Sequence, residues 1–248
     1  MSTGFVHTTR TVFARELASY FATPLAAVFL AVFLALSAGM TFFLGGFFER
    51  GQADLIAFFT WHPWLFLILM PAIGMRLWAE ERRSGTIELL MTLPVSPLSL
   101  VLGKFLAAWV FAGIALILTM PLWLTVNWLG SPDNGVIIAS YLGSWLMAGA
   151  FLAVSALVSV LTRNQVIAFI VAVIVSFLLV MMGSELVLSA LRGWLPASVT
   201  EWFASMSFLN HFGRLSRGVL EAGTVFFFTS LIVLCLWLNA QFLDLKRG

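Results

Sequence analysis

The residues of this sequence that could do chemistry are concentrated in one short segment, residues 76–98. Only 10% of the 248 residues are charged, yet this segment carries acidic and basic side chains in quick succession between two long apolar runs. They are Arg76, Glu80, Glu81, Arg82, Arg83 and Glu88. A segment with this density of charge does not belong to the apolar runs on either side of it. It therefore lies outside the lipid-spanning part of the chain.

Outside this segment the sequence offers no convincing set of catalytic, cofactor-binding or metal-binding residues. The histidines, His7, His62 and His211, are dispersed without metal-ligand spacing, and the serines lack a convincing histidine partner. His62 lies in a Trp-His-Pro-Trp stretch, which is typical of an aromatic belt at the outer membrane interface. The only Gly-Lys pair, Gly103-Lys104, does not continue as the P-loop that cradles nucleotide phosphates. We expect the chain by itself not to be an enzyme.

The composition indicates that the surroundings of this chain are lipid. Hydrophobic residues make up 61% of it, including 24 Phe and 10 Trp. A soluble domain is about 45–50% apolar, so one water-soluble core could not bury this much apolar surface. The single cysteine, Cys235, excludes an intrachain disulfide. The net charge of +2 is not gathered into a basic patch, so we expect membrane lipid and no nucleic acid among the partners.

Six apolar runs are long enough to cross a bilayer, which takes about 20 residues. They lack the alternation of barrel strands, and we therefore predict an all-α integral membrane protein with six transmembrane helices. The first run is too long for the apolar part of a signal peptide, so it is expected to remain as a membrane helix. None carries an ionisable residue near its centre, which argues against ion-coupled transport. The runs are Leu25–Phe48, Leu55–Trp78, Ser99–Trp128, Val136–Leu161, Gln165–Leu188 and Gly223–Leu243.

The basic residues predict the orientation, because cytoplasmic loops carry an excess of Lys and Arg. With six spans, both termini lie on one side. Placing them in the cytoplasm puts nine of the 13 basic residues inside and leaves Arg50, Arg192, Arg214 and Arg217 outside. The inside set is Arg10, Arg15, Arg76, Arg82, Arg83, Lys104, Arg163, Lys246 and Arg247. The charged segment 76–98 is then a cytoplasmic loop between the second and third spans.

A short helix is predicted inside that loop. Ser84-Gly85-Thr86 interrupts the helix that leaves the membrane, and Pro94 ends the next one, so a helix can run from about residue 86 to 92. Glu88 lies in its first turn, where the helix dipole favours a negative charge. The apolar residues Ile87, Leu90 and Met91 share one face of this helix. An interfacial loop packed on lipid headgroups is the alternative interpretation.

Three further segments have distinct patterns. Residues 1–23 predict an amphipathic helix in the cytoplasmic interface, serving either as a membrane anchor or as an additional partner contact. Residues 189–222 are too apolar for a free external loop and too interrupted for a span. In the fourth run small residues recur at four-residue spacing, for example Ser140, Ser144 and Ala148, and Ser155 and Ser159. That spacing favours close packing against other helices, and a route for an amphipathic substrate is the alternative interpretation.

The sequence resembles a known family in three places. EERRSGTIELLMTLPVSPLSLVLGKF, residues 80–105, resembles the coupling-helix segment of type-2 ABC exporter permeases, the ABC-2 class. The N-terminal RELASYFATPLAAVFLAVFLALSAGMTFF and the stretch SFLNHFGRLSRGVLEAGTVFFFTSLIVLCLWL, residues 207–238, are similar to the gliding-motility-type branch of that class. The nitrous-oxide-reductase maturation permeases are relatives of this branch. The resemblance covers essentially the whole chain as one permease domain, residues 1–248.

The resemblance implies a multi-pass permease subunit in a bacterial inner membrane. Such a subunit pairs with a second copy or with a related permease that has a large external domain, and it docks on an ABC ATPase dimer that binds ATP and Mg. In the family, the helix after the second span fits a cleft in the ATPase. The matching residues here are Glu80, Glu81, Arg82, Arg83, Thr86, Ile87, Glu88, Leu90 and Met91. The charged residues among them can form ion pairs at the rim of this contact, where they set register more than affinity. The function implied is export of a lipid-like or amphipathic substrate, and a non-transporting scaffold or mechanically coupled subunit is the alternative.

Two more hypotheses follow from this resemblance. In the resembled fold, short re-entrant helices lie before the last span, which would put Glu185, Arg192 and Glu201 near the exit as an external gate. Interfacial solvation of these charges is the simpler alternative. The first span offers Gly39, Phe42, Phe43 and Phe47 as a dimer seam and an apolar constriction.

Overall fold

The protein is described by a computed structural model over residues 2–92, 95–194, 196–218 and 221–245, with the side chains of residues 2, 3, 89 and 91 also outside the description. Over these ranges the chain is helical, with no strand. The elements are α1 (Ser2–Phe21), α2 (Pro24–Gly39), the π-helical turn η1 (Met40–Leu44), α3 (Ile56–Thr60), α4 (His62–Gly74), α5 (Arg76–Ser84), α6 (Thr86–Thr92), α7 (Pro97–Ile117), α8 (Met120–Leu129), α9 (Asn134–Leu161), α10 (Gln165–Met181), α11 (Glu185–Arg192), α12 (Ala197–Ser205), α13 (Phe208–Leu215) and α14 (Ala222–Asp244).

Helix α9 is the centre of the bundle, and α4, α7, α10 and α14 pack around it. Small residues make this packing possible. A Cβ atom added at Gly74 of α4 would lie only 2.3 Å from the Cβ atom of Ser155, so the two backbones approach closely at this point. The packing interpretation of the fourth run is therefore confirmed by the burial of its small residues: Ser140, Ser144, Ala148, Gly149, Ala153, Ser155 and Ser159.

Two tryptophans hold α7 against α9. The indole N–H of Trp109 donates to the carbonyl oxygen of Trp145 at 2.8 Å, and that of Trp145 donates to the carbonyl oxygen of Trp109 at 3.1 Å. Their rings stack with centroids 4.3 Å apart and an interplanar angle of 14°. The reciprocal arrangement provides each half-buried indole N–H with an acceptor.

Four continuous helical stretches of the described chain are long and apolar enough to cross a membrane, and a bent pair of helices brings the number to five. The prediction of six such helices is therefore supported only in part. The four are Pro24–Leu44, Pro97–Leu129, Asn134–Leu161 and Ala222–Asp244. In the second of these, α7 ends at Ile117 and α8 begins at Met120, whereas the sequence predicted one unbroken run.

The second predicted run is not one helix. It is divided into α3, α4 and α5, and α4 has only 13 residues, or about 20 Å of helix at 1.5 Å per residue. Pro63 lies in the first turn of α4 and therefore helps to start a new helix after the turn at Trp61. A second interruption falls at Met75, directly before the charged helix α5.

The fifth predicted run ends early. Helix α10 stops at Met181, and the chain turns by 75° into α11, so residues 185–188 belong to a separate helix and do not continue α10. Ser184 explains the new start, because its hydroxyl accepts a hydrogen bond from the N–H of Val187 as an N-cap. The first run also ends early, at Leu44 after the π-helical turn, where the sequence predicted Phe48.

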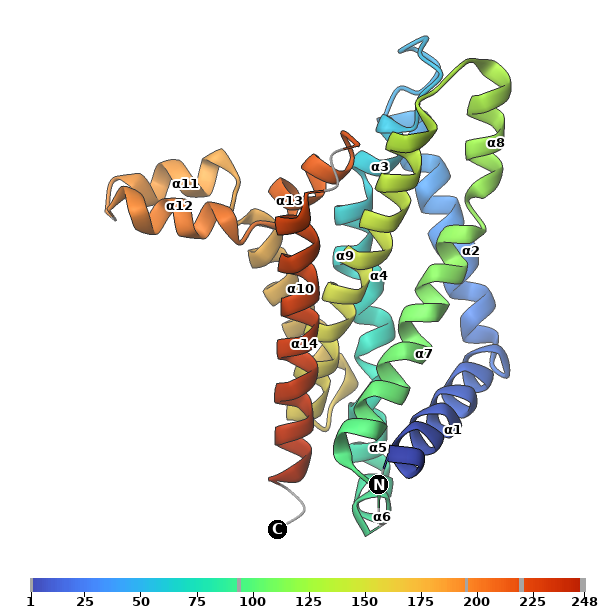
Figure 1. The fold of residues 1–248 in the computed structure, drawn as a ribbon, viewed down its shortest axis with the longest axis vertical. Coiled ribbons are helices and arrows are strands. Elements are labelled where there is room, and N and C mark those ends of the chain that lie inside the picture. The colour runs from blue at the N-terminus through green and yellow to red at the C-terminus, as the bar shows by residue number, and fades with distance from the viewer. Residues whose placement is uncertain (1, 93–94, 195, 219–220, 246–248) are drawn as a thin grey trace.

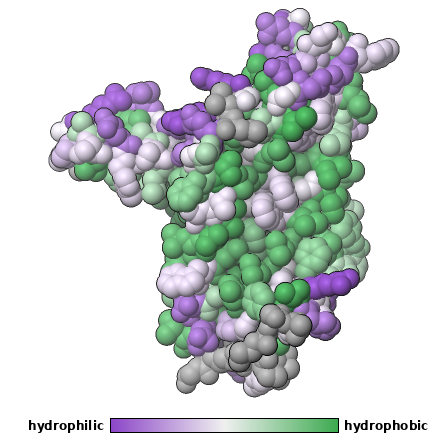
Figure 2. Space-filling model, in the orientation of Figure 1, coloured by the Kyte–Doolittle hydropathy of each residue, from purple (hydrophilic) through white to green (hydrophobic). Residues whose placement is uncertain are grey.

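The two ends of the bundle differ in composition and architecture. Helix α1, the last residues of α14 and the short helices α5 and α6 lie together at one end (Figure 1). At the other end α11 and α12 form a hairpin that projects sideways from the bundle (Figure 1). Figure 2 shows a broad apolar band over the middle of the molecule, with hydrophilic side chains gathered towards its ends. This distribution is the one expected of a helical membrane protein.

Candidate functional site

The short helix predicted inside the charged loop is present, as α6, and its bounds are those expected from the sequence. Gly85 separates it from α5 and has a φ of +73°, a conformation that favours glycine because it has no Cβ. The hydroxyl of Ser84 contacts that of Thr86 at 2.9 Å, and the N–H of Glu88 donates to the carbonyl of Gly85 at 3.2 Å. The predicted stop at Pro94 lies outside the described residues.

The apolar face of α6 is partly turned towards the protein itself. Ile87 is half-buried and packs against the hydrophobic core, and Leu90 is also half-buried. The side chain of Met91 lies outside the described residues. Thr86 and Glu88 are exposed. The site therefore presents a short helix with an exposed polar face and a partly accessible apolar face.

The predicted rim charges divide into two groups. Glu80 and Arg83 are exposed, and Glu80 pairs with Arg76 one turn earlier at 3.1 Å. By contrast, Glu81 is only 17% exposed and pairs inside the protein, while a guanidinium nitrogen of Arg82 donates to the backbone carbonyl of Val160. Glu81 and Arg82 thus have partners within the chain, which the sequence interpretation did not foresee.

The partner of Glu81 is Lys104, a residue of α7 that sequence reasoning treated only as a topology signal. Its Nζ atom lies 2.8 Å from Oε1 of Glu81 and 3.0 Å from Oε1 of Glu16 in α1. The side chain of Lys104 is only 5% exposed, and its ammonium lies 5.3 Å from the centre of the Trp78 ring. A charged residue well inside an apolar helix was the available signal, because such a residue needs a partner.

The two carboxylates around Lys104 differ in their pKa. For Glu16, burial raises the pKa, but Lys104 and Arg15 together outweigh burial and leave it below its ordinary value. For Glu81, burial also raises the pKa, Lys104 offsets it only in part and nearby Glu16 adds to the rise, so the pKa lies above its ordinary value. The Oε2 atom of Glu81 is buried without a hydrogen-bond partner among the described residues.

A serine joins the start of α5 to α9. The hydroxyl of Ser159 donates to the carbonyl of Met75 at 2.8 Å and accepts from the N–H groups of Trp78 and Ala79 at 3.1 and 3.0 Å. The first N–H groups of a helix have no partner inside it, so an acceptor from outside must satisfy them. Ser159 supplies that acceptor, and it fixes the point at which the charged loop begins.

Helix α1 packs directly on α7. A Cβ atom at Gly103 would lie 2.7 Å from the Cβ atom of Val12, and the ring of Tyr20 stacks on that of Phe111 with centroids 5.0 Å apart. A polar pocket of about 270 Å³ lies where α1, α5 and α7 meet, and Lys104 is among its lining residues. The amphipathic helix predicted for residues 1–23 is therefore an integral part of this site.

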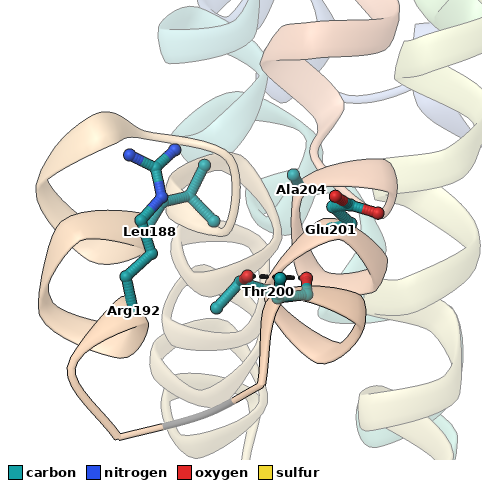
Figure 3. Close-up of a pocket in the computed structure, with 6 residues that line it drawn as sticks. Leu188, Arg192, Thr200, Glu201 and Ala204 are labelled. Atoms are coloured by element: carbon teal, nitrogen blue, oxygen red, sulfur yellow. Dashed lines mark hydrogen bonds between the residues drawn. The ribbon is translucent and has the colours of Figure 1, made fainter.

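The three residues of the external-gate hypothesis lie on the α11–α12 hairpin. A guanidinium nitrogen of Arg192 is 3.5 Å from a carboxylate oxygen of Glu185, and the two side chains are 60% and 80% exposed. Arg192 and Glu201 line a pocket of about 250 Å³ between the two helices (Figure 3). The structure brings these residues together, but their exposure also agrees with simple solvation.

The residues of the seam hypothesis do not form one ring. The ring of Phe42 contacts those of Phe47 and Phe48, with centroids 5.6 and 5.3 Å away. Phe47 is buried, whereas Phe43 is 87% exposed. Gly39 has open space where a side chain would be. Gly39 and Phe43 are thus available to a neighbouring molecule, and Phe47 belongs to the interior of this chain.

His62 lies in the interior of the bundle, which the aromatic-belt interpretation did not foresee. The side chain is fully buried, and its Nδ1 atom lies 2.7 Å from the hydroxyl of Ser144 on α9. Phe58 and Phe66 surround the ring, with centroids 4.4 and 5.3 Å away. Within the described residues, no group of three or more His, Cys, Asp or Glu side chains is placed to hold a metal ion.

The apolar band and the long helices define a multi-pass helical membrane protein. The chain belongs to the ABC-2 family: a profile described as ABC-2 family transporter protein matches residues 49–240, most of the chain. No curated protein matched it. The chain is therefore a permease, the membrane component of an ABC transporter, and the family implies a partner ATPase subunit. The matched range contains α5, α6 and Lys104 but not α1 with Glu16.

Proposed function

We propose that this chain is an exporter permease of the gliding-motility-type branch, related to the nitrous-oxide-reductase maturation permeases, in a bacterial inner membrane. Its α6 helix docks in a cleft of an ABC ATPase dimer, which binds ATP and Mg. The observation that carries this proposal is the arrangement of the loop: α5 is hydrogen-bonded to α9 and paired with α7, whereas α6 follows a glycine hinge and presents exposed polar residues. Such a helix can enter a partner's groove while its base stays in place.

Six crossings are part of the proposal. Helix α4 alone is shorter than the hydrocarbon core, which is about 30 Å thick, but α3, α4 and the start of α5 as far as Trp78 follow one another and together supply a longer path. With α10 as a further crossing before the bend at Gly183, the chain passes six times. The basic residues then support cytoplasmic termini.

The docking proposal is tested by placing a charge on the apolar face of α6. Leu90→Asp would bury a carboxylate in the groove, at a cost on the order of several kcal/mol. The wild-type chain, purified from membranes of its host, should bring a P-loop ATPase with it, identified by mass spectrometry, and the variant should not. Leu245→Asp is the matched control, because Leu245 is a 76% exposed leucine that follows α14 at the same end. Equal ATPase recovery with both variants would contradict the docking role.

Orientation is tested with single cysteines at three exposed positions, after replacing Cys235 by serine. Gln52 and Ser131 lie in adjacent loops at one end, since a Cβ atom at Gly130 would lie 2.6 Å from that of Ala53. Ser84 lies at the other end, beside α6. A membrane-impermeant maleimide should label the first two in intact spheroplasts, and Ser84→Cys only after lysis. The reverse pattern would invert the proposed topology.

A second permease is proposed to pack against α2. Only 22% of the best apolar window of the first span is buried, and Val28, Val32 and Leu36 are exposed along one side. A benzophenone maleimide attached to Val32→Cys, with Cys235 replaced by serine, should therefore crosslink on illumination to a second copy or to a related permease, because photocrosslinking needs no cysteine on the partner. Ala26→Cys is the matched control, because Ala26 is buried in the same helix. A Val32→Cys variant that stays uncrosslinked in the intact complex would contradict this seam.

An apolar groove on the surface of the bundle supports the proposal of a lipid-like or amphipathic substrate. A groove of about 410 Å³ lies between α7, α8 and α9, and apolar side chains such as Ile114, Met120 and Trp145 line it. A mechanically coupled scaffold would use the same α6 helix, so only substrate flux distinguishes it from an exporter. Flux of a fluorescent lipid in proteoliposomes containing the permease and its ATPase, compared with the Leu90→Asp variant, makes that distinction.

A further inference from the structure

One buried ammonium group connects three helices, α1, α5 and α7. Nζ of Lys104 on α7 contacts carboxylates of Glu16 on α1 and Glu81 on α5 at 3.0 and 2.8 Å. On α5 it also faces the fully buried ring of Trp78, three residues before Glu81 and hence on the same side of that helix. Helix α5 thus offers the ammonium two cation-binding groups, an aromatic face and a carboxylate.

The two carboxylates depend on Lys104 to different degrees. Glu16 has a second cation, because a guanidinium nitrogen of Arg15 lies 2.7 Å from its Oε1 atom. For Glu81, the described part of the chain supplies one ion pair, with Lys104. Its other oxygen is buried without a hydrogen bond in that part. Displacing α5 would therefore leave the Glu81 carboxylate buried and uncompensated, which is strongly unfavourable.

Apolar contacts hold α1 on α7 independently of Lys104. Val12 packs against Gly103, and Tyr20 stacks on Phe111. Helix α5 is also attached to α9, through Ser159 and through the bond from Arg82 to the carbonyl of Val160. Lys104 is therefore the element that fixes α5 relative to α7, whereas the α1–α7 contact has other supports.

We propose that Lys104 is a positioning residue of the coupling movement. By holding Trp78 and Glu81, Lys104 sets the position of α5. Because α6 follows α5 after the hinge at Gly85, Lys104 also sets the position from which α6 meets the ATPase. A displacement imposed on α6 then moves α5 and α7 together instead of being absorbed in the loop. This inference rests on the proposed function, because it concerns the same α6 helix.

The position of α6 can be measured without the ATPase. Spin labels at Glu88 on α6 and Ile117 on α7, in the chain with Cys235→Ser reconstituted in nanodiscs, report the distance between the two helices. Lys104→Met should broaden this distance distribution about twofold or more, because α5 loses its cation, and Lys104→Arg should restore it. A second pair, at Leu142 on α9 and Val233 on α14, should stay unchanged and shows that the bundle is intact.

Two isosteric variants test the contacts of Lys104 with Glu81 and with Glu16 separately. They also replace Lys104→Met in the test if that variant does not fold. Glu81→Gln should broaden the Glu88–Ile117 distribution, whereas Glu16→Gln should leave it narrow, because Trp78 and Glu81 still hold α5. Unchanged distributions in Lys104→Met or Glu81→Gln, with the control pair intact, would overturn the proposal. Equal broadening by Glu16→Gln would also overturn it, because α5 would then not depend specifically on Glu81.

A functional readout distinguishes this inference from the docking proposal. The Lys104→Met chain should recover the ATPase within about twofold of the wild-type amount. The resulting complex should hydrolyse ATP about tenfold more slowly than the wild-type complex, and Lys104→Arg should restore the rate. Normal turnover in Lys104→Met would contradict the positioning role. Normal ATPase recovery with Leu90→Asp would instead contradict the docking proposal and leave the spin-label result standing.

Discussion

The two ends of the bundle use ion pairs in opposite ways. At the α1–α5–α7 end the lysine is 5% exposed and both carboxylates are 17% exposed, so the charges are enclosed between helices. On the α11–α12 hairpin, Arg192 and Glu185 are 60% and 80% exposed. An exposed pair contributes about 0–1 kcal/mol, because water and salt screen it, whereas breaking an enclosed pair is strongly destabilising. Charge therefore fixes helix positions at the first end but not at the second.

The largest effect is expected at the enclosed cluster. Lys104→Met leaves two buried carboxylates without their shared cation and should lower the free energy of unfolding by about 3–5 kcal/mol. Denaturation with sodium dodecyl sulfate, followed by circular dichroism, measures this change. Lys104→Arg keeps the charge and is the control. If Lys104→Met lowered the free energy of unfolding by no more than the loss of an exposed ion pair does, the two ends would not differ in how strongly their ion pairs stabilise the fold.

A smaller effect is expected where the same end relies on neutral hydrogen bonds. Ser159→Ala removes the acceptor of two buried N–H groups at the start of α5, and each group left unsatisfied costs about 1–3 kcal/mol. The neighbouring Ser155 is the matched control, because within the described part of the chain its hydroxyl bonds to the Phe151 carbonyl of its own helix and to no other helix. The same denaturation assay should rank Ser159→Ala well below Ser155→Ala in stability, and an equal ranking would contradict the role of Ser159.

The pH dependence of stability sharpens the comparison further. Because folding raises the pKa of Glu81, its contribution is fully present below pH 4.5 and is lost as the pH rises through the raised pKa. Folding lowers the pKa of Glu16, so its contribution is present above pH 4.5 and is lost as the pH falls through the lowered pKa. In the wild type, the free energy of unfolding should fall as the pH rises through the pKa of Glu81 and as the pH falls through the pKa of Glu16. Glu81→Gln should remove the first of these decreases, and Glu16→Gln should remove the second. Identical profiles in wild type and variants would contradict both assignments.

The smallest effect is expected on the α11–α12 hairpin. Arg192→Met breaks the exposed pair with Glu185 and should change the free energy of unfolding by less than about 1 kcal/mol. The change should also shrink at high salt, because exposed charges are screened. A decrease of several kcal/mol in the free energy of unfolding would mean that a partner buries this hairpin in the assembled transporter. The ion pairs at the two ends would then both be enclosed.

Local signals in the sequence predicted the elements whose determinants are local. The Ser-Gly-Thr interruption and the first-turn Glu88 were sufficient to predict α6, and small residues at four-residue spacing predicted the packing of α9. The turn at Gly183 and the shortness of α4 were missed, because an apolar window records hydrophobicity and not chain direction. These errors explain why six uniform spans were expected.

The core of the candidate site could not be predicted, because its contacts are distant in the sequence. Lys104 meets Glu16, 88 residues earlier along the chain, and no local pattern joins them. Glu81 was assigned to a partner's rim since its neighbours in sequence are charged and exposed, but the helical turn directs it inward beside Trp78. The burial of His62 was missed for the same reason, because Ser144, whose hydroxyl contacts its ring nitrogen, lies on another helix.

The stacked pair of Trp109 and Trp145 has a consequence for observing this protein at work. Two indoles with centroids 4.3 Å apart and nearly parallel planes share their electronic excitation, so they should give a coupled signal in near-ultraviolet circular dichroism. That signal depends on the separation of α7 and α9, the helices that carry Lys104 and Ser159. The chain therefore contains an intrinsic optical probe, and its band should change if ATP turnover by the partner separates these two helices.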